Sequence, residues 1–460
     1  MLLKGRRTAD PHAITEGVIW KQLLAFFFPI LLGTFFQQLY NTADAIIVGK
    51  FVGKQALAAV GGGTGTLINL IVGFFVGLSS GATVILSQFY GARNNEGVSR
   101  AVHTAIAMAI CGGLMLTVIG LTASPIILHW MSTPDDVLDL AILYTRIYFC
   151  GTVASLIYNI GAGLLRAIGD SRRPLYFLIA SCLINIVLDI IFVVGFEMGV
   201  AGAALATILS QASNAALVII TLLRSQEPLK LHFRKIRLHF DLLPRIIRIG
   251  LPAGFQSVMY SLSNLIIAAA INTIGTDMVA GYTAYSKLDG LFWMMINAFG
   301  VSITTFVGQN FGARKMDRVH KSVRVCLLMA TAATLALSGT LLIAGRPLLR
   351  LFANEEIVIE NGLMVQRFLV PFFVTYVCIE VFSGTMRGAG ESLRPMLMTL
   401  FGICILRVIW VKLIAPIQAG SFLFMLTCYP LSWIITSLLF VAYYLSGRWL
   451  VRCKRKAGFD

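Results

Sequence analysis

Long apolar stretches run through this chain and restrict what it can fold into. About 20 apolar residues in a helix span the hydrocarbon of a bilayer, and lipid excludes irregular backbone because its N–H and C=O groups would lack partners. The chain has 460 residues, 57% of them hydrophobic and 13% charged, whereas a soluble protein carries about 25% charged residues. We therefore predict an all-α membrane protein with twelve transmembrane helices. These lie near residues 18–48, 57–87, 97–128, 138–165, 174–195, 199–223, 242–272, 279–308, 318–345, 360–386, 395–416 and 419–446.

Two motifs recur at one distance along the chain. Residues 87–93 (SQFYGAR) resemble residues 308–314 (GQNFGAR), and residues 166–174 (RAIGDSRRP) resemble residues 387–395 (RGAGESLRP). Both pairs are offset by 221 positions (308 − 87 and 387 − 166). Each repeat holds six predicted spans, and an even number of crossings returns the chain to its starting side. We therefore expect two six-helix lobes in parallel repeat, related by a pseudo-two-fold axis along the membrane normal.

The repeat and the charge pattern together predict the domains. We expect a cytoplasmic segment 1–17, an N-terminal lobe 18–223, a cytoplasmic linker 224–241, a C-terminal lobe 242–446 and a basic cytoplasmic tail 447–460. With both termini inside, the positive-inside rule places roughly 28 of the 37 Lys and Arg residues in the cytoplasm. The linker either contacts lipid headgroups or is a solvated connection between the lobes.

Several other classes of function are disfavoured. The net charge of +16 is spread over short segments between apolar stretches and forms no basic domain, so we expect no nucleic-acid partner. The eight cysteines contain no C-x-x-C pair, and no metal-ligand cluster, nucleophile constellation or Walker motif is present. We therefore expect neither an enzyme nor a cofactor, and an ion gradient as the energy source. Such a protein would lie in the bacterial cytoplasmic (inner) membrane.

The first predicted span carries a polar face that includes an acid. Gln37, Asn41 and Asp44 follow i, i+4 and i+7, and Tyr40 stands one turn before Asp44. An Asp at a helix centre costs about 2.5–3.5 kcal/mol to insert. Pro29 interrupts the same span and predicts a bend, which is either a static kink or a hinge.

The fifth and sixth spans add further polar residues to the same half. Asn185 and Asp189 follow Ser181 at four-residue spacing, and Thr207 begins a polar face that continues with Gln211 and Asn214. Two acids among oxygen ligands suit proton binding, and hard oxygen ligands equally suit sodium. The alternative is ordinary interhelical hydrogen bonding, which accounts for Asn185 and Thr207 better than for the acids.

The second half differs from the first in its charges. Isoleucines stand where Asp44 would repeat, and the seventh span keeps Gln256 and Tyr260 on its polar face. The clear acid is Glu380 in the tenth span, which either attracts a cationic substrate or pairs with Lys287 of the eighth span. Asp289 lies two residues beyond Lys287 and faces a different side of the helix.

These residues resemble a known transporter family. Thr15-Glu16-Gly17, Pro29, the run 37–44 and the repeated Gly-Ala-Arg resemble the multidrug and toxic-compound extrusion (MATE) family, and the chain looks like its DinF-like prokaryotic branch. The resemblance implies twelve helices in two lobes around a V-shaped cavity. It also implies that Asp44, Asn185, Asp189 and Thr207 form the coupling-cation site. In the sodium-linked branch acids lie in the seventh and tenth spans, but this chain has Gln256 in the seventh and Glu380 does not clearly align.

We therefore expect a secondary antiporter that exports amphiphilic or cationic organic compounds by alternating access, in exchange for protons or sodium. The alternative is a flippase for a lipid-linked saccharide. The expected partners are small amphiphilic substrates and membrane lipids, and we expect a monomer. By the resemblance, Tyr40 lines the cavity and Pro29 marks the bend. The substrate cavity would be lined by Gln37, Tyr40, Asn41, Gln256, Tyr260 and Glu380.

Overall fold

The computed structural model describes residues 13–131, 133–418 and 421–459, and within these ranges it contains helices and connecting turns but no strand. The predicted all-α fold is confirmed. Eleven helical segments are long and apolar enough to cross a membrane, and the pair Asp135–Cys150 and Thr152–Ala167, bent by 51°, brings the described total to twelve. The bend falls at Gly151, where a Cβ would meet the Ile208 side chain.

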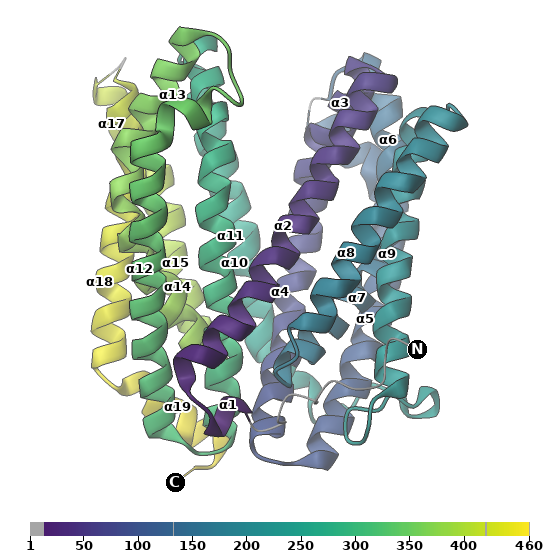
Figure 1. The fold of residues 1–460 in the computed structure, drawn as a ribbon, viewed down its shortest axis with the longest axis vertical. Helices are drawn as coiled ribbons and strands as arrows, with labels where there is room; N and C mark the ends of the chain where they lie inside the picture. Colours follow the sequence, from purple (N-terminus) through teal and green to yellow (C-terminus); the bar gives the residue numbers. More distant parts are fainter. Residues whose placement is uncertain (1–12, 132, 419–420, 460) are drawn as a thin grey trace. The chain divides into compact units, whose positions relative to one another are not determined.

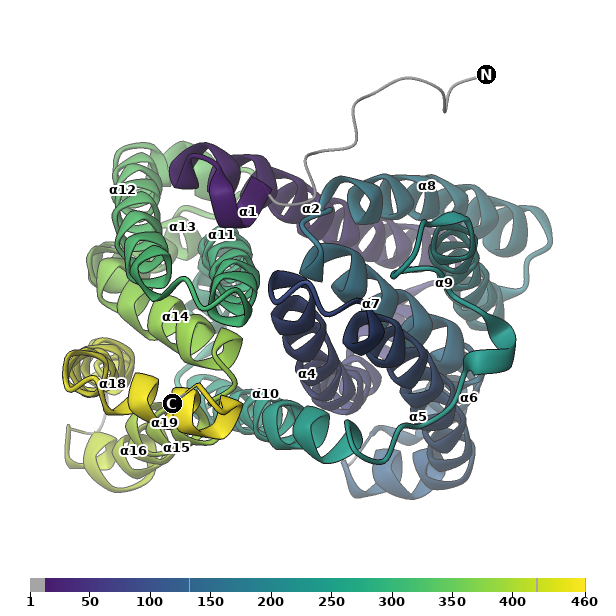
Figure 2. The same ribbon diagram turned by 90° about the horizontal axis from the view of Figure 1, so that it is seen from below.

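The first half of the chain forms long helices (Figure 1). The helices are α2 (Ile19–Phe51), α3 (Lys54–Gly61), α4 (Gly63–Gly91), α5 (Asn95–Trp130), α6 (Asp135–Cys150), α7 (Thr152–Ala167), α8 (Arg172–Asp189), the π-helix η1 (Ile190–Gly195) and α9 (Gly199–Arg224). The 3-10 turn η2 (Phe233–Lys235) lies in the connection that follows. Helix α7 packs against α4, α5 and α9 and lies among them in Figure 2. The core around it is aliphatic and includes Leu164 and Val218.

The second half is built in a similar way. Its elements are α10 (Leu243–Ile271), α11 (Thr276–Gly312), α12 (Met316–Leu349), α13 (Glu356–Leu369), η3 (Val370–Phe372), α14 (Phe373–Gly388), α15 (Leu393–Thr399), η4 (Leu400–Ile405), α16 (Leu406–Ile409), η5 (Trp410–Ile414), η6 (Ala415–Gln418), α17 (Phe422–Leu426), α18 (Cys428–Leu445) and α19 (Arg448–Ala457). Helix α14, the repeat counterpart of α7, packs against α11, α12 and α18. Each half therefore surrounds its fourth span with neighbouring helices.

The repeated sequence motifs mark equivalent turns at the ends of helices. Arg93 and Arg314, the last residues of the two Gly-Ala-Arg triplets, both have positive φ, at 56° and 58°. The turns after α7 and α14 contain Gly169 and Gly390, at φ 96° and 94°. A left-handed residue ends many helices because it lets the following N–H groups reach back to the last carbonyls. The repeat read from the sequence is thus present in the backbone conformation.

The chain divides into two compact units whose boundaries lie inside helices. One unit contains residues 28–254, and the other contains residues 14–27 and 255–460. Helix α2 passes between units next to Pro29, and α10 does so next to Pro252. The start of α2 is held in the second unit by aromatic contacts: the rings of Phe27 and Phe299 stack with centroids 4.2 Å apart.

The start of α10 is held in the first unit by a glycine crossing with α4. Gly77 and Gly81 on α4 meet Gly250 and Gly254 on α10, and a Cβ on Gly77 would lie 2.6 Å from the Gly254 Cα. Four-residue spacing on both helices lets the backbones touch, as small residues do in membrane helix pairs. Linker residues 225–242 accordingly belong to the first unit together with this part of α10.

Candidate functional site

Two acids lie buried together in the first unit. Asp44 on α2 is 5% exposed, and Asp189 at the end of α8 is fully buried. Their carboxyl groups lie near enough to interact electrostatically. The sequence predicted both as intramembrane acids, and the folded chain brings them to one place from positions 145 residues apart (189 − 44).

A hydroxyl from a third helix reaches this pair. The Thr207 hydroxyl on α9 donates to the carbonyl of Ala203 at 3.0 Å and also lies 3.4 Å from Oδ2 of Asp44. Asn185, one turn before Asp189 on α8, is fully buried. The predicted set of Asp44, Asn185, Asp189 and Thr207 is therefore entirely buried, and contacts within it link α2 to α8 and α9.

Much of the hydrogen-bonding capacity of this cluster is unused. Oδ1 of Asp44, both carboxylate oxygens of Asp189 and both amide atoms of Asn185 have no hydrogen-bond partner among the described residues. A buried carboxylate without a donor or counter-ion is costly, and binding a proton or a cation removes that cost. The donor set of carboxylate, amide and hydroxyl oxygens is of the kind that hard cations prefer.

Tyrosines surround the two acids, and some of them were missed from the sequence. Tyr40, one turn before Asp44, is half-buried and interacts with both Asp44 and Tyr148. Tyr144 and Tyr148 of α6 stack with centroids 6.3 Å apart, and Tyr144 interacts electrostatically with both acids. Their four-residue spacing in a predicted span was the available signal. By contrast, the predicted cavity residues Gln37 and Asn41 of α2 have exposed side chains.

A π-helix follows Asp189 directly. Residues Ile190–Gly195 widen the helix at this point, and such segments are often found at functional sites. The eleventh span contains two π-helices, and one of them, Trp410–Ile414, lies at the matching position of the repeat, where Trp410 occupies the place of Asp189 (189 + 221). The backbone feature is present in both halves, but the acid is present only in the first.

The predicted residues of the second unit form separate contacts. Gln256 donates from Nε2 to the Thr399 hydroxyl at 3.1 Å, and the hydroxyls of Tyr260 and Tyr376 lie 3.0 Å apart. Glu380 lies one turn after Tyr376 on α14, and its carboxyl group packs against Gly300 of α11, where a side chain would collide with it. Lys287 is exposed, and no ion pair joins it to Glu380 in the part of the chain that the structure describes.

The second unit also buries a charged residue that is not among the predicted site residues. Arg407 is 2% exposed, and its guanidinium carbon lies 4.4 Å from the centroid of the Tyr429 ring. Asp289 lies in the same aromatic region and accepts a hydrogen bond from Trp293 Nε1 at 2.7 Å. The signal for Arg407 was available, because it is the one charge in the apolar run 395–411.

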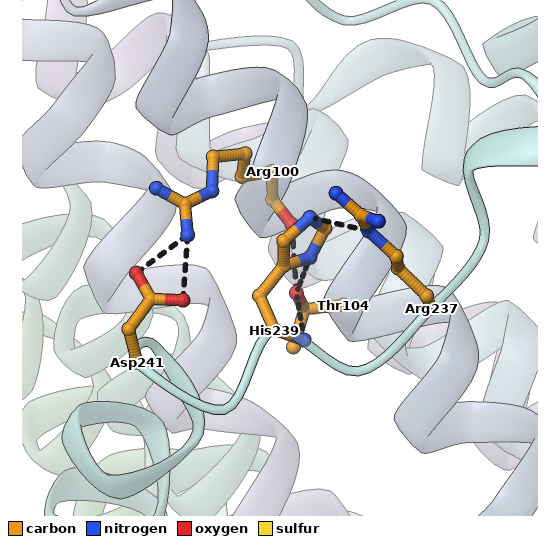
Figure 3. Close-up of polar contacts among 5 residues, drawn as sticks. All are labelled: Arg100, Thr104, Arg237, His239 and Asp241. Carbon is orange, nitrogen blue, oxygen red and sulfur yellow. Dashed lines mark hydrogen bonds and ion pairs between the residues drawn. The ribbon is translucent and has the colours of Figure 1, made fainter.

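The connection between the two halves of the chain docks on α5 (Figure 3). Arg100 of α5 donates from Nη2 to both carboxylate oxygens of Asp241, at 2.5 and 2.6 Å. Nδ1 of His239 lies 2.8 Å from the Thr104 hydroxyl, and Arg237 donates from Nε to Nε2 of His239 at 3.3 Å. Desolvation, together with the charges of Arg100 and Arg237, lowers the pKa of His239 below its ordinary value. These contacts attach the linker to the first unit through its own polar side chains.

The long apolar helices and the repeated turns define a multi-pass membrane protein built from two related halves. A family model described as MatE matches residues 29–191 and 252–411, which together cover more than half of the chain. The chain belongs to the MATE family of multidrug efflux transporters. The two matched regions correspond to the two halves of the internal repeat.

Named relatives and solved structures agree with this assignment. The chain is 27% identical to the probable multidrug resistance protein YoeA of Bacillus subtilis, over 93% of each chain. It is 24% identical to the probable multidrug resistance protein NorM of Thermotoga maritima, over 94% of this chain and 93% of the relative. A crystal structure of MATE in a straight conformation matches with a TM-score of 0.88 at 23% identity, covering 98% of this chain and all of the other. An outward-facing MATE transporter matches with a TM-score of 0.86.

Proposed function

We propose that this protein is a secondary antiporter that exports amphiphilic, often cationic, organic compounds in exchange for protons or sodium. The observation that carries the proposal is the buried acid pair of Asp44 and Asp189 with its unused oxygen ligands. Intramembrane acids are expensive and typically mark ion or substrate pathways. The protein would lie in the bacterial cytoplasmic membrane with both termini inside, as the Lys and Arg distribution favours.

The position of Asp44 suggests how ion binding is coupled to transport. Asp44 lies on α2, the helix that passes between the two units beside Pro29. A proton or cation on the acid pair removes an uncompensated charge, so the helices around it pack differently with and without the ion. If the ion and the substrate each favour a different arrangement of the helices, binding of one weakens binding of the other, which is the thermodynamic requirement for exchange.

The substrate proposal rests on the relatives and on the chemistry of the polar faces. The relatives in Bacillus subtilis and Thermotoga maritima are described as probable multidrug resistance proteins. Aromatic rings bind organic cations through cation–π interactions, and the acids supply negative charge. We propose that substrates are small amphiphilic molecules, that the chain acts as a monomer among membrane lipids, and that it needs no cofactor. The residues that we propose to contact these substrates are Gln37, Tyr40, Asn41, Gln256, Tyr260 and Glu380.

One observation favours the alternative of a lipid-linked saccharide flippase. Such a protein needs cations to hold the phosphates of its substrate, and Arg407 is a buried cation in the eleventh span. Arg407 is a single residue, whereas Asp44 and Asp189 form a pair with a third polar contact from Thr207. The antiporter is therefore the function that the site supports better.

Transport in proteoliposomes tests the proposal. Export of a fluorescent organic cation is measured with a proton gradient and a sodium gradient imposed separately. We expect one of the gradients to drive export, and Asp44→Asn, which keeps the size of the side chain but not its charge, to abolish it while ligand binding remains. Asp136→Asn is the matched control, because Asp136 lies at the exposed start of α6. Export by Asp44→Asn at the rate of the unmodified protein would contradict the assignment of the site.

A further inference from the structure

The guanidinium of Arg407 is held between aromatic rings in the second unit. Its carbon lies 4.4 Å from the ring centroid of Tyr429 and 5.9 Å from that of Trp433, both on α18. Nε donates to the Ser432 hydroxyl at 2.9 Å. These contacts fix the side chain in one orientation and use one edge of the guanidinium fork.

The other edge of the fork has no partner. Nη2 of Arg407 is buried and makes no hydrogen bond among the described residues. Nε1 of Trp433 and the hydroxyl of Thr436, both on α18, are also buried there without a partner. Two of these three groups act only as donors, and the third, a hydroxyl, also donates. Helix α16, which carries Arg407, packs against α18, so unpartnered donors lie buried on two neighbouring helices, and an anionic oxygen is the kind of group that they would bind.

Arg407 forms no ion pair with the acids of this unit that the structure describes. Within the described ranges, no carboxylate lies within 4.0 Å of its nitrogens. The carboxylate of Asp289 interacts with Arg407 at longer range. Its oxygens are taken by Trp293 Nε1 at 2.7 Å and the Tyr285 hydroxyl at 3.4 Å. The positive charge therefore remains available to a ligand.

An apolar cavity of about 180 Å³ lies in the same unit as this cation. Its wall includes Cys404, three residues before Arg407, and Thr399 on the preceding turn. Helix α10 contributes Phe255 and Gln256 to the lining. The exposed lining of the cavity is apolar. A molecule with an apolar body and an acidic group would bind the cavity with the first and Arg407 with the second.

We propose that Arg407 anchors a binding site for the anionic oxygen group of an amphiphilic organic acid, whose apolar part occupies the cavity beside Cys404. The inference rests on the proposed export of amphiphilic compounds and extends their range from cations to acids. Arginine suits this role because its planar fork matches a carboxylate or a phosphate with two parallel hydrogen bonds. Its permanent charge means that the site needs no protonation step to accept an anion.

Equilibrium dialysis of the purified full-length protein tests the proposal with three probes of one shape. The probes are 2-naphthoate, which is anionic, 2-naphthalenemethanol, which is neutral, and 2-naphthylmethylamine, which is cationic. The variants are Arg407→Met, which keeps an apolar side chain without charge, and Arg407→Lys, which keeps the charge without the fork. Lys412→Gln is the matched control, because Lys412 is the next cation along the same span and is exposed.

We expect the protein to bind 2-naphthoate more tightly than the neutral probe. Arg407→Met should weaken 2-naphthoate binding at least about tenfold and leave the cationic probe unchanged, whereas Lys412→Gln should alter neither. Equal binding of the anionic and neutral probes, or unchanged 2-naphthoate binding in Arg407→Met, overturns the proposal and leaves Arg407 a packing residue. If Arg407→Met does not fold, Arg407→Lys decides: we expect a smaller but selective loss of 2-naphthoate affinity, and no loss overturns the proposal.

A lipid phosphate could supply the same chemistry as a free acid, and a second arm separates the two sources. The dialysis is repeated in nanodiscs of phosphatidylcholine alone and with added phosphatidylglycerol. Displacement of 2-naphthoate by phosphatidylglycerol identifies a lipid headgroup as the occupant, and unchanged binding identifies a free acid. The dialysis measures binding without an ion gradient. A failure of the proposed antiport, seen as absent export in proteoliposomes, is therefore distinguishable from a failure of the proposed anion site.

Discussion

The Thr207 hydroxyl lies 3.4 Å from Oδ2 of Asp44, although the two residues are 163 positions apart in the chain. Asp44 comes from α2 and Thr207 from α9, so the contact links the first span of the unit to its last. The hydroxyl also donates to the Ala203 carbonyl of its own helix. Because the single hydroxyl proton is shared between two acceptors, its hydrogen bond to Asp44 is weak in the absence of an ion. The hydroxyl oxygen is then free to act as a ligand for a bound cation.

Replacing this hydroxyl should reduce the affinity of the site for sodium, because the ion loses an oxygen ligand. Thr207→Val keeps the shape of the side chain and removes the oxygen, at a cost of about 0.5–1.5 kcal/mol for a typical hydrogen bond. We expect the sodium concentration for half-maximal export under a sodium gradient to rise roughly three- to tenfold. Thr207→Ser keeps the hydroxyl and should behave nearly as the unmodified protein. If valine and serine behave alike, the oxygen of Thr207 does not take part in ion binding.

Pro29 should control the rate of transport more than substrate affinity. Proline removes one hydrogen bond from α2 at the point where the helix leaves one unit for the other. Pro29→Ala restores the hydrogen bond and stiffens the helix, so we expect slower export under a saturating gradient and an equilibrium affinity changed by less than about twofold. Pro125 lies inside α5, away from the unit boundaries, and Pro125→Ala is the control. Unaltered turnover in Pro29→Ala would identify the bend as a static feature.

Cysteine labelling tests the predicted orientation. Glu227 lies in the connection before α10, and Asp135 lies at the start of α6. The native Cys111 and Cys150 are exposed and must first be replaced. A membrane-impermeant maleimide added to intact cells should label a cysteine at Asp135 but not one at Glu227, with the order reversed in inside-out vesicles. Labelling of both positions from the same side would rule out the twelve-span topology with the termini inside.

Glu380 should affect the choice of substrate and leave ion coupling in place. It packs against Gly300 in the second unit, the unit that lacks a counterpart of Asp44. Glu380→Gln removes the charge at nearly constant volume. We expect the affinity for a cationic substrate to fall about tenfold and that for a neutral analogue to change little, measured by equilibrium binding in one preparation. Loss of gradient-driven export for both substrates would place the coupling site in the second half instead.

The attachment of the connecting segment to α5 should weaken at acid pH. The Thr104 hydroxyl donates to the Arg100 carbonyl at 2.8 Å, so it accepts from Nδ1–H of His239, and Nε2 of His239 accepts from Arg237. Protonating His239 converts this acceptor into a donor that faces Arg237. Its pKa is lowered in the folded state, so the detached segment binds more protons, and attachment is lost as pH falls below the ordinary value of 6.5.

Hydrogen–deuterium exchange of residues 225–242 measures this effect. Exchange, corrected for its intrinsic pH dependence, should be faster at pH 5.5 than at pH 7.5. His239→Gln, which has an acceptor and a donor but does not titrate in this range, should remove most of the difference. The other charged or titratable groups around His239 are Arg100, Arg237, Asp241 and His103. A pH effect of the same size in His239→Gln would show that a group other than His239, such as His103, causes it.

Local sequence patterns determined much of this protein. Apolar stretches of membrane length, the repeat at 221 positions and acids such as Asp44 and Asp189 could be read directly. Helix geometry explains why: hydrophobic length and the i, i+4 spacing relate residues within a few turns of one another, and that information is contiguous in the chain. The repeat also related distant parts of the chain to each other, because two copies of one motif adopt similar turns.

Only the tertiary structure decided which of these residues meet. The contact between Asp44 and Thr207, the aromatic surroundings of Arg407 and the division of α2 beside Pro29 all depend on how helices pack across long stretches of chain. Each helix presents several faces to its neighbours, and the pairing of faces follows from the combined packing of many side chains. A glycine crossing such as Gly77 with Gly254 shows the reason: its closeness depends on both helices at once, and neither sequence segment alone specifies the other.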